Sequence, residues 1–154
     1  MKYEEVSNEV TELFKKVKDE HFPELVNAKI LILSCNKKRK NKGNIVLGTI
    51  SKPNELIKFL TKDQEPDEGY DYIMVLDKYL IDACDKEDLE RTIRHELRHT
   101  YVDIESEKNP YRLVGHDYED FRAEIVINSD DPNWAQRAAL VVDTRYENAS
   151  EEAN

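Results

Sequence analysis

The sequence DKEDLERTIRHELRHTYVDI, residues 85–104, has the pattern of one long amphipathic helix. Asp85 is a typical N-cap residue, and Asp88 in the first turn suits the positive end of the helix dipole. At about 100° per residue, one narrow stripe collects the side chains that are expected to face the core. This stripe contains Leu89, Ile93, Leu97, Thr100 and Ile104.

Residues 95–99 of this helix read His-Glu-Leu-Arg-His, an HExxH motif. His95 and His99 lie about 40° apart around the helix, and roughly 200–240° from the start of the core stripe. Two neutral imidazoles at positions i and i+4 can chelate a single Zn²⁺, and Glu96 can reach a metal-bound water without being a ligand. The alternative is a solvated charged face that matches the motif by chance. The orientation of the histidines away from the core favours the metal site.

A catalytic zinc ion needs three protein ligands and one open position, so the third ligand must come from elsewhere in the chain. Imidazole is the usual partner of two imidazoles, which favours His116. A carboxylate on the following helix would instead make a His-His-Glu site, and a further carboxylate can accept a hydrogen bond from a ligand N–H. The carboxylates available for these two roles are Asp117, Glu119, Asp120 and Glu124.

The composition restricts the class of protein. The chain has 154 residues, 33 acidic and 23 basic, for a net charge of −10. This length predicts one domain, and the acidity argues against whole-surface nucleic-acid binding. The sequence has neither an apolar run of about 18 residues nor a signal-like N-terminus, so we expect a cytoplasmic protein without a membrane partner. Two cysteines cannot form a disulfide framework or a four-cysteine zinc ribbon. The oligomeric state stays open.

The remaining pattern predicts an α+β fold with a single domain over residues 1–147 and a disordered tail over 148–154. Strands 28–35 and 45–50 are expected to pair as a hairpin around a basic turn, and strand 28–35 is apolar enough to be covered on both faces. Cys35 and Cys84 are expected to be buried free thiols, and Trp134 a core residue. The other predicted elements are helices 2–20, 55–60, 117–128 and 132–147, and a strand at 70–76.

The basic turn, residues 37–42, has two interpretations. It is a solvated hairpin tip that deters edge-to-edge aggregation, or it is a phosphate contact that brings the protein to nucleic acid. The second interpretation would use Lys37, Lys38, Arg39 and Lys40. The acidic character of the rest of the surface favours the first.

Two motifs resemble a known family. The HELRH helix after a strand, followed by Gly115-His116-Asp117-Tyr118-Glu119-Asp120-Phe121, resembles the SprT-like (Spartan-like) zinc metallopeptidases. The likeness is closest to the small phage-type metallopeptidases, whose last motif reads His-Asp-x-x-x-Phe, and it covers about residues 25–127. The spacing from His116 to Phe121 is one residue longer than in Spartan-type proteins, and the zinc ribbon of some relatives is absent.

The resemblance implies a phage or prophage zinc metalloendopeptidase with a minimal zincin-like fold, in which a sheet of three or slightly more strands packs on helices. It implies one Zn²⁺ held by His95, His99 and His116, Glu96 as general base, and a protein or peptide substrate. Zinc would lower the pKa of its bound water towards about 7 and polarise the scissile carbonyl. Glu96 would pass the proton of the water to the leaving amine.

Several points stay open at this level. Tyr101, Tyr111, Arg112 and Tyr118 are all near enough in sequence to stabilise an oxyanion, and nothing in the sequence selects one. The segment Ile45–Ile50 is a candidate edge strand that could hold an extended peptide by strand addition. A non-catalytic zinc-containing binding module and a hydrolase with a non-peptide substrate are the alternatives to a peptidase.

Overall fold

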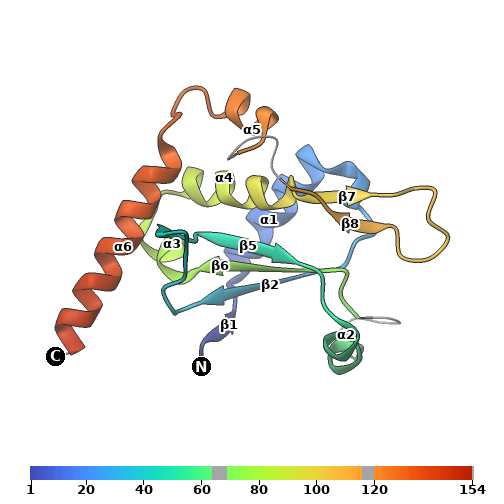
Figure 1. The fold of residues 1–154 in the computed structure, drawn as a ribbon, viewed down its shortest axis with the longest axis horizontal. Coiled ribbons are helices and arrows are strands. Elements are labelled where there is room, and N and C mark those ends of the chain that lie inside the picture. Colours follow the sequence, from blue (N-terminus) through green and yellow to red (C-terminus); the bar gives the residue numbers. More distant parts are fainter. Residues whose placement is uncertain (64–68, 116–119, 154) are drawn as a thin grey trace.

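The computed structural model describes residues 1–63, 69–115 and 120–153, and it has an α+β fold as expected. At its centre is a four-stranded sheet with the order β1-β2-β6-β5 (Figure 1). Strands β2 and β6 are parallel, whereas both outer pairs are antiparallel. The four strands are β1 (Tyr3–Glu5), β2 (Ile30–Cys35), β5 (Gly48–Ser51) and β6 (Tyr72–Asp77).

The predicted hairpin between strands 28–35 and 45–50 is wrong. Strand β6 lies between β2 and β5, so β5 is an edge strand. The basic turn instead folds on itself, through a small hairpin of β3 (Lys40–Asn41) and β4 (Asn44–Ile45). Pairing of consecutive strands is the local default, but the two apolar strands β2 and β6 take the two central places, which leaves β5 at the edge.

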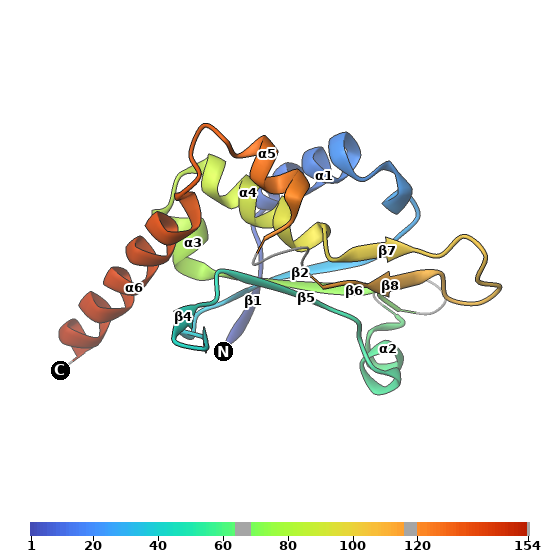
Figure 2. The ribbon, with the colours of Figure 1, turned by 45° about the horizontal axis from the view of Figure 1, so that its top comes forward.

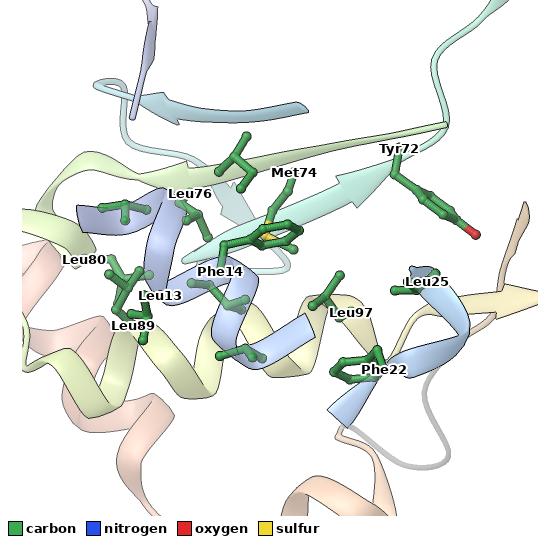
Figure 3. Close-up of a cluster of buried hydrophobic side chains, with 14 of the residues drawn as sticks. Leu13, Phe14, Phe22, Leu25, Tyr72, Met74, Leu76, Leu80, Leu89 and Leu97 are labelled. Carbon is green, nitrogen blue, oxygen red and sulfur yellow. The ribbon is translucent and has the colours of Figure 1, made fainter. Parts of the chain in front are cut away.

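The core lies on one face of the sheet. Tyr72, Met74 and Leu76 of β6 are fully buried there, against α1 (Asn8–His21) and α4 (Lys86–Leu97). Figure 3 shows side chains from α1, β6 and α4 in this cluster. The other face of the sheet, with Leu31, Leu33, Ile73 and Val75, is only half-buried, so the expectation that both faces are covered is wrong. These four apolar side chains form the partly exposed face of the sheet.

The first helix begins later than predicted. Residues 3–5 form β1, which pairs with β2 from Tyr3 opposite Cys35 to Glu5 opposite Leu33. The Ser7 side chain then caps α1 by accepting a hydrogen bond of 3.4 Å from the Val10 N–H. A serine N-cap marks the start of a helix, so α1 does not extend back to residue 2. The apolar stripe continues before Ser7, and for that reason it placed the start of the helix too early. His21 is the last residue of α1 and is half-buried.

The helix that carries the HExxH motif is shorter than the predicted 85–104. It ends at Leu97, and residues 100–102 form β7 (Thr100–Val102), which pairs with β8 (Tyr111–Leu113). Thr100 Oγ1 donates to the Leu97 carbonyl at 2.7 Å. The run Thr-Tyr-Val has high strand propensity, and this outweighs the helical periodicity. Ile104, placed on the core stripe by sequence, is 90% exposed.

Two elements project from the end of the sheet opposite to α6 (Trp134–Ala153). They are the β7–β8 hairpin and α2 (Glu55–Thr61), as Figure 2 shows. The helix predicted at 55–60 is confirmed as α2, and Asn54 caps it, since its Oδ1 accepts from the Ile57 N–H at 2.9 Å. Two short helices were not predicted, the 3₁₀ helix η1 (Pro23–Leu25) and α3 (Lys78–Ala83), which Asp77 caps.

The last two helices differ from their predicted bounds. Helix α5 spans Arg122–Ile127; residues 116–119, where the sequence placed its first turn, lie outside the described residues. Helix α6 starts at Trp134 instead of 132 and runs to Ala153, so it includes most of the segment expected to be a disordered tail. In the described part of the chain, no helix is long and apolar enough to cross a membrane. Both cysteines are free, Cys35 buried and Cys84 half-buried.

Candidate metal centre

A cleft of about 1000 Å³ lies along the edge of the sheet. Strand β5 forms one side, the C-terminal half of α4 forms the back, and residues of β4, α5 and the start of α6 close it. His95, Glu96 and His99 all line this cleft, together with Asp120. The structure therefore brings the motif residues and one of the predicted carboxylates to one concave surface.

The two motif histidines lie side by side although only one is inside the helix. Their ring centroids are 5.5 Å apart, with the rings nearly perpendicular. His95 belongs to the last turn of α4, and His99 follows the helix end, where its N–H donates to the Glu96 carbonyl at 3.1 Å. The Phe121 ring packs on both, with centroids 5.5 Å from His95 and 4.9 Å from His99. This tight final turn keeps the i, i+4 arrangement where a longer helix was expected.

The Nδ1 atom of each histidine has a defined partner. His95 Nδ1 lies 2.7 Å from Asp120 Oδ1, and His99 Nδ1 lies 2.7 Å from the Val114 carbonyl. Both partners are acceptors, so each Nδ1 carries the proton and Nε2 carries the lone pair in the neutral ring. Metal-binding histidines characteristically use their second nitrogen in this way. The donor chemistry of the pair therefore fits a first-row metal ion such as zinc.

The environment shifts the protonation of both rings. Burial lowers the pKa of His95, but the hydrogen bond that His95 donates to Asp120 and the charge of Glu96 outweigh it, so this pKa lies above its ordinary value. Burial lowers the pKa of His99. His99 is thus predisposed to the neutral form, and His95 is held by a carboxylate that stabilises a positive charge on its ring.

Glu96 is a buried carboxyl on the wall of the cleft. Burial raises its pKa to about 7, against the opposing effects of His95 and Arg39. The approach of α4 to β5 at this point depends on Gly48, since a Cβ there would lie 3.1 Å from Thr92 Cγ2 and 3.4 Å from Glu96 Cγ. The sequence analysis did not identify Gly48. A glycine inside a strand is a signal for close approach of another element.

Glu124, one of the alternative ligands, has a different role. It is fully buried, and its two oxygens accept from Arg94 Nε at 2.7 Å and Arg98 Nε at 2.9 Å. Arg94 also donates to Asn128 Oδ1 at 2.5 Å. These bonds join α5 to α4 behind the histidines and engage both oxygens of Glu124, so they do not support the alternative in which Glu124 is a ligand. A carboxylate held by two guanidinium groups is a structural element.

Three of the predicted site residues, His116, Asp117 and Glu119, lie outside the described residues. Within residues 1–63, 69–115 and 120–153, no group of three or more His, Cys, Asp or Glu side chains is arranged to hold a metal ion. The described residues on either side of 116–119 contact the two histidines, Val114 at His99 and Asp120 at His95.

The oxyanion candidates do not lie on the described surface of the cleft. Tyr111 packs edge-on against Tyr72, with ring centroids 5.8 Å apart, and Tyr101 is 53% exposed on β7. Arg112 donates to the Asn109 carbonyl at 2.8 Å. None of the three is among the residues that line the cleft, and Tyr118 lies outside the described residues.

The basic turn is partly used by the fold itself. Lys38 pairs with Asp143 of α6 at 2.5 Å, and Arg39 donates to Thr49 Oγ1 at 3.1 Å and to the Val75 carbonyl at 3.4 Å. Lys37 and Lys40 are exposed. These contacts anchor the turn to the sheet and to α6. The nucleic-acid interpretation of Lys37, Lys38, Arg39 and Lys40 therefore has no support.

The edge of β5 is oriented for strand addition. The Asp77 N–H donates to the Leu47 carbonyl at 2.8 Å, and the register continues with Thr49 opposite Val75. Hydrogen-bonded and non-hydrogen-bonded pairs alternate in an antiparallel ladder. The N–H and C=O groups of Gly48 and Ile50 therefore point away from β6, along the cleft. The predicted candidate segment, Ile45–Ile50, contains most of this edge.

Residues 1–143 match the model of a protein family described as "Putative phage metallopeptidase". No curated protein and no solved structure matches the chain.

Proposed function

Since the chain belongs to the "Putative phage metallopeptidase" family, we propose that it is a zinc-dependent endopeptidase with a zincin-like site related to that of the SprT-like enzymes. His95, His99 and His116 hold the ion, and Glu96 is the general base. The family name designates a metal-dependent peptidase. Beyond the family name, we propose that the metal is zinc, that the three histidines are its ligands and that Glu96 is the general base.

The observation that carries the proposal is the shared orientation of His95, Glu96 and His99 on the wall of one cleft. Two imidazoles whose Nδ1 atoms are hydrogen-bonded to Asp120 and to the Val114 carbonyl present the chemistry of a metal site. The choice of His116 rests on ligand chemistry and on its position between these two contacts along the chain.

A zinc ion held by His95, His99 and His116 would supply Lewis acidity, which would make a water molecule nucleophilic at neutral pH and polarise the scissile carbonyl. Asp120 and Val114 hold the two imidazoles in the tautomer and orientation that the site requires. Glu96 accepts a proton from the attacking water and donates it to the nitrogen of the leaving amine. Its burial in the cleft excludes bulk water from this transfer.

The substrate is an extended segment of a polypeptide. The outward N–H and C=O groups of Gly48 and Ile50 can hydrogen-bond its backbone, as in other cases of strand addition. Because Gly48 lies beside Glu96, this pairing brings a peptide bond close to the general base. Main-chain pairing of this kind accepts many sequences, so selectivity must come from the walls of the cleft.

The test is Glu96→Gln, measured beside wild type for zinc content and for cleavage of an unfolded protein such as reduced casein. We expect one zinc per chain in both proteins and a loss of cleavage of roughly 10²- to 10⁴-fold in the variant. His95→Ala is the matched control, which should lose both zinc and cleavage. Equal cleavage by Glu96→Gln and wild type would refute the proposal, and zinc binding without any cleavage by wild type would indicate a non-catalytic zinc module.

A further inference from the structure

The wall of the cleft differs between its two ends. At the end nearest to α6, the described walls are mainly apolar and come from three separate elements. At the opposite end the described lining residues include Leu113 and Val114, beside His99. The apolar residues at the α6 end are Ile45 of β4, Ile125 of α5, and Trp134, Ala135 and Ala139 of α6.

Trp134 is buried, as expected for a core residue. It is 5% exposed, but it does not belong to the main core cluster between the sheet, α1 and α4. It lines the cleft instead. A large aromatic ring that is buried at the side of a cleft provides an apolar surface for a ligand.

Ala135 and Ala139 leave space beside this ring. They are four residues apart and therefore lie on the same face of α6. Both line the cleft, and a longer side chain at either position would project into it. The charged side chains among the described lining residues, Lys42, Glu96 and Asp120, come from other elements, and α6 contributes no charge to the wall.

We propose that the α6 end of the cleft is a specificity pocket for a bulky apolar side chain of the substrate, on one side of the scissile bond. This inference rests on the proposed peptidase function and adds to it the class of residue beside which the chain cuts. Ile125 and Trp134 contact the apolar side chain, and the space beside Ala135 and Ala139 admits it. A charged residue at the same position would lose its hydration without gaining a partner.

The primary test measures binding separately from cleavage. Trp134 is the only tryptophan in the chain, so its emission reports occupancy of this end of the cleft. The zinc-loaded Glu96→Gln variant is titrated with two sets of peptides of equal length and net charge, which differ only in having leucine or aspartate at a single scanned position. We expect the leucine peptide to bind roughly 10- to 100-fold more tightly at one position, with a shift in Trp134 emission.

The matched variants are Ala139→Leu, which fills the pocket, and Thr144→Leu, which introduces the same side chain at an exposed site on α6. In Ala139→Leu the preference for leucine over aspartate should fall at least about tenfold, whereas Thr144→Leu should keep it. Circular dichroism confirms that both variants are folded. An unchanged preference in folded Ala139→Leu, or equal binding of leucine and aspartate peptides, would overturn the inference.

Cleavage profiling provides the second measurement. Wild-type protein digests a mixture of unfolded proteins, and mass spectrometry identifies the cut sites. Leucine, isoleucine, methionine and phenylalanine should be enriched at one position next to the cut bond. Cleavage without this enrichment overturns the specificity pocket and leaves the peptidase intact. A wild type that does not cleave, with the leucine preference in binding retained, refutes the proposed function and supports the apolar pocket.

Discussion

Two clusters of polar side chains lie back to back on the C-terminal half of α4. Behind the helix, Arg94 and Arg98 hold both oxygens of Glu124. In front of it, His95, Glu96 and His99 line the cleft, with Asp120 at His95. In the first cluster, the carboxylate of Glu124 is paired with the two guanidinium groups inside the protein. In the second cluster, the two histidines and Glu96 line a concave surface that is accessible to solvent. Neighbouring residues of one motif thus divide into a structural set and a chemical set.

The structural cluster supports the chemical one. Glu124 anchors α5 to α4, and Asp120 lies just before α5. The carboxylate that orients His95 is therefore positioned by an ion cluster in which neither histidine takes part. This arrangement predicts that a substitution in the cluster behind the helix lowers mainly the stability of the protein. A substitution in the cluster in front of the helix should lower mainly the affinity for the metal.

The largest effect is expected from Glu124→Ala. The change leaves Arg94, whose side chain is 6% exposed, as a buried charge without its carboxylate. Breaking a buried ion pair in this way costs about 3–5 kcal/mol of unfolding free energy. Urea denaturation followed by circular dichroism measures it. The control is Glu147→Ala, at an exposed site on α6, which should stay within about 0.5 kcal/mol of wild type. A loss below about 1 kcal/mol in Glu124→Ala would contradict the structural role of the cluster.

A smaller effect, on metal affinity, is expected from Asp120→Ala. Loss of the acceptor at His95 Nδ1 should weaken zinc binding roughly 10- to 100-fold. Competition with a chelating dye measures the zinc dissociation constant. The matched control, Asp19→Ala on an exposed site of α1, should leave this constant unchanged. If both variants bind zinc equally well, Asp120 does not orient the ligand.

The smallest effect is expected from Gly48→Ala, which tests the contact between β5 and the front cluster. The new Cβ would lie 3.1 Å from Thr92 Cγ2 and 3.3 Å from Leu76 Cδ2, so the helix or the strand must shift. Overpacking of this kind costs about 1 kcal/mol, at the low end of its range. Thermal denaturation measures the cost, with Gly115→Ala as the control, because a Cβ there meets no atom of the described residues within 4 Å. Equal melting temperatures would show that this approach is not tight.

Much of the fold is predictable from local signals. Helix α2 begins directly after Asn54, strand β2 lies within the apolar run that predicted it, and β6 overlaps its predicted run but extends one residue further, to Asp77. These signals depend on the side chains of a few consecutive residues, so a single sequence contains them. The errors fall where two local preferences compete. Thr100–Val102 fits both the helical stripe and a strand, and pairing with β8 decides for the strand.

The sequence by itself determined which kinds of group meet at the site, since the spacing of His95, Glu96 and His99 brings two imidazoles and a carboxylate close together. Only the tertiary structure decided which carboxylate contacts a histidine, which one is held by arginines, and that β5 is an edge strand. Asp120 and Glu124 are four residues apart and chemically alike. Their roles differ because of contacts with residues 25 to 30 positions away, and no local pattern encodes contacts of that range.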